Sequence, residues 1–393
     1  MYPFPIRKLL VTESVRDDAR AAARAERLVL AIGSPPLQVV SPDGLARFEA
    51  EWFANRPSAL EKRCGAMDYS EGWTVILQTY DGGVRPATFR DAVHEAGEGR
   101  VCQSGAEIHC AQGCYHHCAY CHCDPLFRIA CDLETLADAL PGLFANNPSQ
   151  RLWKFDNMTD QITLEPEYGA SELLVPLFGR TDDRFLLLYT KSDNVEHLLE
   201  LPHGGHTLIS WSLAPPTQAR ELELNAPDPA ARIEAMRRCR QAGYTVRVRL
   251  SPIVPVKGWR KEMQQLLDDL FRDVRPDVIT IDILGWCHPE TVCGFMDVGL
   301  LEPKWRETLE RLVAEGFRTG GKHLFPHELR ADALRFVIEQ IRARSPGTPV
   351  SICNETHEMW DELGETMGMA PGRYVCCCGP DSVPGNPMLD ARG

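Results

Sequence analysis

A short cysteine-rich stretch constrains this chain more than any other feature. Cys114, Cys118 and Cys121 are separated by three and then by two residues. A loop with this spacing can present three thiolates to one face of an iron–sulfur cube, but a [4Fe–4S] cluster held by protein alone needs four such ligands. The loop offers no obvious fourth thiolate. We therefore expect a cluster with one iron open to another molecule.

Two other interpretations of this stretch stay open. Structural zinc takes four closed ligands, and the stretch contains enough of them. The candidates are Cys118, Cys121, His116, His117, His122 and Cys123. The stretch could also be a run of buried cysteines with no ligand role. Cys110 and Cys123 fit that role best, because unpaired cysteine is often buried as a small apolar residue.

An aromatic residue, Tyr120, comes directly before the last of the three cysteines. With this residue the stretch resembles the radical S-adenosylmethionine (SAM) superfamily. The resemblance implies a [4Fe–4S] cluster whose open iron binds the amino and carboxyl groups of SAM. It implies that the reduced cluster splits SAM into an organic radical. It also implies an electron donor such as flavodoxin or ferredoxin as a partner.

The cysteine content bears on the compartment in which the chain works. Fifteen cysteines among 393 residues would suggest disulfides in a secreted protein. The first residues, however, lack the sustained apolar segment of a signal peptide, and no run approaches the ~20 apolar residues of a membrane span. We therefore expect a cytoplasmic protein that does not span a membrane.

The net charge of −13 argues against nucleic acid as a partner. Affinity for nucleic acid comes mainly from Lys and Arg side chains that neutralise phosphates. The basic cluster at 237–240 is more simply explained as the solvated face of a helix. We expect a small-molecule or peptide substrate instead.

Apolar runs predict a mixed α/β chain in three parts. In residues 1–100, the runs 9–11, 28–32 and 74–77 alternate with helical stretches and predict a small N-terminal α/β appendage. Residues 101–300 carry the catalytic core. Residues 301–393 form a C-terminal extension with a cysteine-rich tail.

Strands and helices alternate through the core, which predicts a parallel sheet with right-handed crossovers. The best-marked helix begins with Asp228 as N-cap and Pro229, and it ends before Gly243. Because the cysteine loop follows the first strand, we expect a partial (β/α)6 barrel. The predicted strands are 107–110, 151–155, 185–189, 207–212, 245–250 and 278–283.

Ligands in such sheets bind beyond the carboxyl ends of the strands. Polar residues crowd these ends in the segments 156–160, 190–194, 210–212, 251–252 and 285–288. We therefore expect the candidate site along this edge of the sheet.

Several of these segments resemble the spore photoproduct lyase family. The similar segments are 190–195, the Ser-Trp-Ser turn at 210–212, 232–235 with 242–244, and 252–253 with 258–259. The resemblance covers about residues 100–300. It implies SAM contacts from Thr159, Lys191, Ser212 and the backbone near Ser251. A lysine and hydroxyl groups can bind the carboxylate and the ribose of SAM.

One position departs from the lyase family. Asn157 stands where the family has its hydrogen-donating cysteine, and asparagine cannot donate a hydrogen atom in its place. We still place Asn157 among the residues that face the cofactor. The departure and the net charge favour a relative of unassigned or specialised function over the lyase itself.

The tail holds the candidate catalytic residues Cys376, Cys377 and Cys378, which follow Cys353. Adjacent side chains cannot all face one way, so two at most would meet one ligand. They could form a thiophilic or metal site or a redox-active pair, or have no catalytic role. A cysteine-rich C-terminus on a lyase-like core also resembles the radical SAM enzymes of arsinothricin biosynthesis, although the cysteine spacing does not clearly match.

Two arginines stand out in the strand 245–251, where Arg247 and Arg249 share one face and Val248 lies on the other. The apolar face should meet the helices, so the arginines should point into the barrel. Buried charges need anionic partners. We expect a structural ion pair, for example with Asp282, or, for Arg249, the carboxylate of SAM or of an anionic substrate.

The leading hypothesis is a radical SAM enzyme, a lyase or transferase, that acts on a small molecule or peptide in specialised biosynthesis. One alternative transfers a SAM-derived 3-amino-3-carboxypropyl group to arsenic, and another is lyase-like DNA repair. A zinc or iron–sulfur regulatory protein would explain the cysteines, but it would not explain Lys191 and the polar strand ends.

Overall fold

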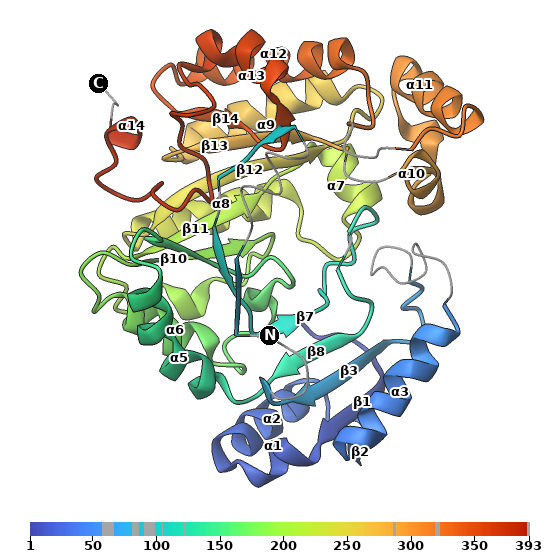
Figure 1. The fold of residues 1–393 in the computed structure, drawn as a ribbon, viewed down its shortest axis with the longest axis vertical. Coiled ribbons are helices and arrows are strands. Elements are labelled where there is room, and N and C mark those ends of the chain that lie inside the picture. Colours follow the sequence, from blue (N-terminus) through green and yellow to red (C-terminus); the bar gives the residue numbers. More distant parts are fainter. Residues whose placement is uncertain are drawn as a thin grey trace.

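The computed structural model describes residues 1–56, 67–80, 86–89, 99–103, 105–121, 123–285, 288–318 and 323–390. Within them the chain is a mixed α/β fold built on two main sheets (Figure 1). Two features named from the sequence lie partly or wholly outside these residues: His122, and residues 286–287 of the polar segment 285–288.

The N-terminal sheet reaches further along the chain than residue 100. Its strand order is β2-β1-β3-β8-β7, and all its pairings are parallel except that of β7 with β8. The last two strands flank the cysteine loop. The bounds are β1 (Ile6–Thr12), β2 (Leu37–Val40), β3 (Trp73–Gln78), β7 (Ala111–Gln112) and β8 (Phe127–Ala130). The cysteine loop is therefore joined to this sheet at both ends.

The apolar run 28–32 lies mostly within a helix and does not alternate with one as expected. Helix α2 (Ala19–Ala31) buries Ala21, Ala25 and Leu28 at helical spacing. The side chain of Asp18 caps it by accepting hydrogen bonds from two backbone N–H groups. The alanine-rich sequence before the run favours a helix. The other N-terminal helices are α1 (Glu13–Asp17) and α3 (Pro42–Ala54).

The large sheet contains all six strands predicted from the sequence and two more. Its order is β4-β6-β9-β10-β11-β12-β13-β14, parallel throughout except for β4. The bounds are β4 (Ala87–Phe89), β6 (Ala106–Ile108), β9 (Leu152–Phe155), β10 (Phe185–Thr190), β11 (Thr207–Ser212), β12 (Thr245–Ile253), β13 (Ile279–Ile283) and β14 (Val350–Ile352). Strand β14 comes from the part of the chain after residue 300.

Helices connect the parallel strands and lie outside the sheet (Figure 1). The predicted helix is α8 (Pro229–Gln241), in which the Asp228 side chain accepts a 2.8 Å hydrogen bond from the N–H of Ala231. The others are α5 (Leu133–Asn146), α6 (Ala170–Phe178), α7 (Pro216–Leu222), α9 (Trp259–Asp273), α10 (Pro289–Phe295), α11 (Pro303–Ala314), α12 (His327–Arg344), α13 (His357–Met367) and α14 (Pro387–Asp390). In the described ranges, no helix is long and apolar enough to cross a membrane.

A short two-stranded sheet joins the two sides of the large sheet. Strand β5 (Arg100–Val101), which leads into β6, pairs antiparallel with β15 (Glu355–Thr356), which follows β14. The buried carboxylate of Glu355 in β15 accepts two hydrogen bonds of 2.9 Å from Arg330. This pairing places the end of the chain's last parallel strand beside the entry to the first.

Candidate active site

A cavity of about 490 Å³ lies at the carboxyl ends of the parallel strands. It collects the three cysteines predicted to bind a cluster and all seven residues predicted to face the cofactor. These are Cys114, Cys118 and Cys121, with Tyr120, Asn157, Thr159, Lys191, Ser212, Arg249 and Ser251. Residues from the cysteine loop and from the ends of four different strands therefore meet in one place, as expected for an open α/β sheet.

The cavity has two ends with different side chains. We call the cluster end the part lined by Cys114, Cys118, Cys121, Tyr120 and Lys191. We call the inner end the part lined by Tyr189, Arg249, Cys353, Asn354 and Cys378.

The three cysteines fit an iron–sulfur cluster electrostatically. Burial raises the pKa of the Cys114 thiol well above its ordinary value, and the nearby charges of Asp160, Cys121 and Cys118 raise it further. Three thiolates can lie together in buried surroundings only if cations neutralise their charge. The irons of a cluster supply those cations. The backbone N–H of Cys123 also points to the sulfur of Cys121 at 3.4 Å, a contact of the kind that tunes cluster sulfurs.

The cluster loop is hydrogen-bonded to the segment after α7. The N–H of Ala119 donates to the carbonyl of Leu222 at 2.8 Å, and Cys118 forms a β-bridge with Glu223. The N–H of Asn225 donates to the carbonyl of His116 at 3.1 Å. These backbone contacts hold the loop over the carboxyl ends of the strands.

The buried carboxylate of Glu223 organises the cluster end. It accepts a hydrogen bond from the hydroxyl of Tyr120, and its Oε1 lies 3.2 Å from Nζ of Lys191. Its Oε2 lies 2.6 Å from the guanidinium of Arg232, which also donates to the carbonyl of Ser212 at 3.0 Å. Burial acts to raise the pKa of Glu223, but Lys191 and Arg232 lower it to about 2. Glu223 is therefore ionised and fixes three predicted SAM-facing residues.

A second buried carboxylate, Asp160, links the loop to the end of β10. Its Oδ2 lies 2.8 Å from Nε2 of His116 and accepts a 2.7 Å hydrogen bond from the N–H of Lys191. The hydroxyl of Thr190 donates to it at 3.0 Å. Asp160 thus fixes the backbone from which Lys191 projects, and it engages one of the histidines that the zinc alternative would need.

A third carboxylate, Asp156, orders the strand end at β9. Its Oδ1 lies 2.7 Å from Nδ1 of His109 and accepts a 2.8 Å hydrogen bond from the N–H of Met158. Its Oδ2 accepts a 3.2 Å hydrogen bond from the N–H of Cys110. This places Asn157 and Thr159 at the cavity, where the hydroxyl of Thr159 has no hydrogen-bond partner among the described residues.

The inner end contains polar atoms that are buried without partners. The hydroxyl of Tyr189 and Oδ1 of Asn354 belong to side chains only 6% and 7% exposed, yet neither has a hydrogen-bond partner in the described part of the chain. Nε of Arg249 also has no hydrogen-bond partner in the described part of the chain. The NH2 group of the same side chain donates a single 3.4 Å hydrogen bond to Ser251. Buried polar groups normally find partners, so these atoms are available to a ligand.

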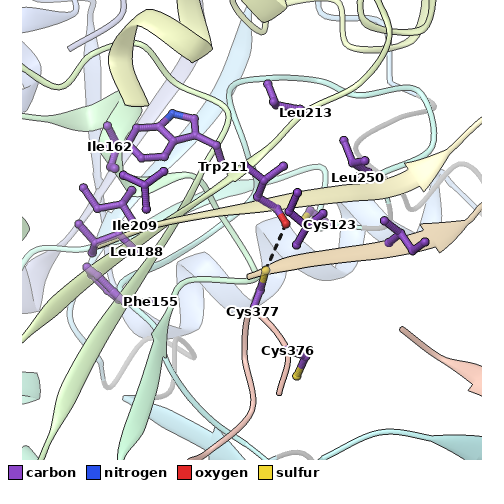
Figure 2. Packing of buried hydrophobic residues seen from close by; sticks show 14 of the residues in the cluster. Cys123, Phe155, Ile162, Leu188, Ile209, Trp211, Leu213, Leu250, Cys376 and Cys377 are labelled. Atoms are coloured by element: carbon purple, nitrogen blue, oxygen red, sulfur yellow. Dashed lines mark hydrogen bonds between the residues drawn. The ribbon is translucent and has the colours of Figure 1, made fainter. Parts of the chain in front are cut away.

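The three adjacent cysteines of the tail separate, and only Cys378 lines the cavity. Cys377 turns to the sheet, where its sulfur lies 3.2 Å from the carbonyl of Val248. Figure 2 shows Cys377 pointing at the sheet and Cys376 pointing the other way. The sulfur of Cys376 lies 3.9 Å from Oε1 of Gln103. The chain turns at 377 and 378, and the three side chains therefore leave it in different directions.

Arg247 is fully buried and forms an ion pair with Asp277, not with Asp282. Asp277 comes just before β13, and the pairing of Arg249 with Thr280 puts Arg247 level with Val278, the residue next to Asp277. The guanidinium of Arg247 also donates to the carbonyls of Cys377 at 3.0 Å and Ser382 at 2.6 Å. Arg247 therefore holds the tail, and Arg249 alone of the two lines the cavity.

Sequence reasoning did not single out Glu223 or Cys353 as cavity residues. Glu223 lies in a short segment between two helices and has no motif around it, although its spacing to Arg232 could have suggested a pair. Cys353 was noted only as preceding the tail. Asp156 and Asp160 were recognised as polar strand ends but without their partners.

The part of the chain that forms this cavity is similar to known proteins. Residues 102–284 match the family model described as spore photoproduct lyase. This stretch is therefore similar to the spore photoproduct lyase family. The resemblance predicted over about residues 100–300 is therefore confirmed.

Curated relatives match a similar share of the chain. The spore photoproduct lyase of Geobacillus sp. (strain Y412MC61) is 25% identical over 171 residues, which cover 42% of this chain and 50% of that protein. The spore photoproduct lyase of Bacillus subtilis (strain 168) is 25% identical over 179 residues, which cover 43% and 52%. The matched region thus spans about half the length of these curated relatives.

Solved structures share the fold. A cysteine-to-serine mutant of spore photoproduct lyase superposes with a TM-score of 0.64 at 17% identity, over 89% of this chain and 99% of that one. A further mutant with bound AdoMet (SAM) and dinucleoside spore photoproduct gives a TM-score of 0.60 at 15% identity, with the same coverage. The mixed α/β class is confirmed. The cofactor prediction is confirmed for the family, which uses a [4Fe–4S] cluster and SAM.

Proposed function

We propose that this protein is a radical SAM enzyme, with a [4Fe–4S] cluster held by Cys114, Cys118 and Cys121. The observation that carries the proposal is the meeting of these three thiols with the predicted SAM-facing residues around one cavity. When bound, the cluster and SAM would supply reductive formation of an organic radical. The protein's own residues hold the cofactors and shape the space for a substrate.

The cluster end supplies the groups that SAM needs. Lys191, held by Glu223 and Asp160, offers an ammonium group for a carboxylate. Thr159 offers a hydroxyl without a partner in the described residues, and Ser212 a second hydroxyl at the cavity, for the ribose. The backbone near Ser251 completes the set on the far side of the sheet.

The inner end indicates a small anionic substrate. Arg249 and Lys154 both reach the cavity, and Lys154 is ion-paired to Glu107 while Arg249 has no carboxylate within 4 Å among the described residues. An unpaired buried guanidinium favours a carboxylate or similar anion. The chain's net charge of −13 disfavours a long polyanion, so a small anion is better suited to this place.

DNA repair is a second candidate function. It is favoured by the match to the spore photoproduct lyase domain and by relatives solved with a dinucleoside spore photoproduct. The net charge and Asn157 count against it, because Asn157 occupies the position of the family's hydrogen-donating cysteine. Nothing in the comparisons supports a transferase, so arsenic as an acceptor rests only on the cysteine-rich tail.

Other parts of the proposal concern architecture and setting. We propose that the seven parallel strands form the partial barrel predicted from the sequence, with residues 1–100 as an appendage and residues 301–393 as an extension. A cytoplasmic location and a flavodoxin or ferredoxin as electron donor belong to the same proposal.

The deciding experiment is anaerobic reconstitution with iron and sulfide, followed by dithionite and SAM. We expect SAM cleavage, and the nucleoside product distinguishes the chemistries, since 5′-deoxyadenosine and 5′-methylthioadenosine arise from different C–S bonds.

Binding of fluorescent duplex DNA at physiological salt separates the two candidate functions. We expect a Kd of roughly 10⁻⁴ M or weaker, as for non-specific contacts. Micromolar binding or conversion of a thymine photoproduct would favour repair.

A further inference from the structure

The cysteine tail is held firmly at the inner end of the cavity. Besides the two bonds from Arg247, the N–H of Cys377 donates to the hydroxyl of Thr280 at 2.9 Å. The N–H of Cys376 donates to the hydroxyl of Ser382 at 3.1 Å. The carbonyl of Pro380 accepts from the start of β9 at 3.0 and 3.1 Å. The position of each thiol is therefore set by the sheet.

Cys376 and Cys378 are the two tail thiols whose side chains interact with each other, whereas the sulfur of Cys377 turns to the sheet. The chain turns at 377 and 378, which shortens the distance between the flanking residues. The carbonyl oxygen of Cys378 and Cε of Lys154 both lie near Gly105, at 3.4 Å and 3.5 Å from where a Cβ on that glycine would stand. Cys378 thus lies beside a lysine and lines the cavity.

Two thiols that line the same cavity, Cys378 and Cys353, differ in pKa because their surroundings differ. The side chain of Cys376 donates to Cys378 and lowers the pKa of that thiol, and the charges of Lys154 on β9 and Arg249 on β12 lower it further, so that it lies well below its ordinary value despite burial. Burial and the carboxylate of Asp282 raise the pKa of Cys353 well above its ordinary value. Of the two, Cys378 therefore carries the more acidic thiol.

We propose that Cys376 and Cys378 form a redox-active dithiol that reduces a small anionic disulfide bound at the inner end. Cys378 faces the cavity as the attacking sulfur, and Cys376 lies behind it as the resolving thiol. Arg249 receives a carboxylate of the disulfide. The inference rests on the proposed function only in taking this cavity as the substrate site.

The electrons balance in two exchanges. The Cys378 thiolate attacks one sulfur of the bound disulfide, its S–S bond breaks, and the first product leaves as a thiolate that takes the proton of Cys376. Cys376 sulfur then attacks Cys378, displaces the second product as a thiolate and forms the internal disulfide. Two electrons pass from the protein to the substrate. A cellular dithiol reductant would restore the pair.

The first test measures thiol reactivity in the reconstituted, anaerobic protein without SAM. Iodoacetamide at pH 7 followed by peptide mass spectrometry should label Cys378 at least about tenfold faster than Cys353, the factor that one pKa unit gives. Cys353 is the matched control because it lines the same cavity. Equal labelling, or faster labelling of Cys353, would overturn the proposal.

The second test uses two disulfides of similar size and opposite charge. Dithiodipropionate, an anion, should oxidise the protein at least about tenfold faster than cystamine, a cation. Mass spectrometry should then find a Cys376–Cys378 disulfide in the wild type and a lasting mixed disulfide at Cys378 in Cys376→Ala. A disulfide to Cys353, or a lasting mixed disulfide in the wild type, would contradict the proposed dithiol. SAM is absent, so these results are independent of SAM cleavage.

Discussion

At the cluster end of the cavity, Lys191 and Arg232 both lie within 3.2 Å of the carboxylate of Glu223, whereas at the inner end Arg249 makes a single 3.4 Å hydrogen bond to a serine. The first arrangement is complete before any ligand binds. The second leaves a guanidinium, a phenol and an amide oxygen with unused hydrogen-bonding capacity in the described structure. A polar network in which every group has a partner holds its side chains in place. Polar atoms without partners can instead be satisfied by a ligand.

This difference separates what the two ends contribute. Substitutions at the cluster end should reduce stability and cofactor binding together, because each side chain there also supports its neighbours. Substitutions at the inner end should change ligand binding or reactivity while the folded protein is little affected. The following variants compare matched residues from the two ends.

The largest effect is expected from the thiols. Cys118→Ala should abolish the visible absorbance of the reconstituted cluster and SAM cleavage, because two remaining thiolates cannot hold the cube. Cys353→Ala, at the inner end, should keep both. Ultraviolet–visible spectra, iron content and nucleoside analysis are the measurements. A cluster that survives in Cys118→Ala would mean that the ligand assignment is wrong.

Glu223→Gln should cost about 3–5 kcal/mol of unfolding free energy at pH 7, because it leaves two buried cations unpaired. The folded-state pKa of about 2 lies below the unfolded value of about 4.3, so the stabilisation is present above pH 4.3 and is lost as pH falls towards 2. Denaturant titrations of the apo-protein should show the wild type and Glu223→Gln converging over that range. Glu221→Gln, at an exposed position near the end of α7, is the control, expected within about 0.5 kcal/mol of the wild type.

Two arginines two residues apart on β12 provide the next comparison. Arg247→Ala leaves the carboxylate of Asp277 buried and unpaired and frees the tail, so it should destabilise the protein by about 3–5 kcal/mol. Arg249→Ala should change stability little and weaken SAM or substrate binding by about 1.5–3 kcal/mol, with the cluster still assembled. Denaturation midpoints and ligand titrations measure the two effects. If Arg249→Ala merely lowered stability with unchanged affinities, its role would be structural.

Local patterns in the sequence predicted the parts of this arrangement that depend on neighbouring residues. Strict alternation predicted that Arg247 and Arg249 point inward, and cysteine spacing predicted the cluster loop. Alternation also predicted that the tail thiols would divide. Each of these follows from the geometry of one loop or one strand.

Patterns of neighbouring residues could not predict contacts between residues that lie far apart in the sequence. Glu223 reaches Tyr120 across more than a hundred residues, and Arg247 finds Asp277 rather than Asp282 because strand register decides which carboxylate lies near it. Strand β14 is three residues long, too short to give a periodic signal. The domain boundaries at residues 100 and 300 stay predictions, although both sheets continue across them.

The smallest expected effect compares two tyrosines that differ in whether the hydroxyl is used. Tyr120→Phe removes a hydrogen bond to the ionised Glu223 and should cost about 1.5 kcal/mol of unfolding free energy. Tyr189→Phe removes a buried hydroxyl that has no partner among the described residues, so it should cost less than about 0.5 kcal/mol and could stabilise the ligand-free protein. Denaturant titrations of both variants without ligand measure this contrast. A loss of stability in Tyr189→Phe equal to that in Tyr120→Phe would mean that the inner end is as fully bonded as the cluster end, and its unused polar atoms would no longer indicate a ligand.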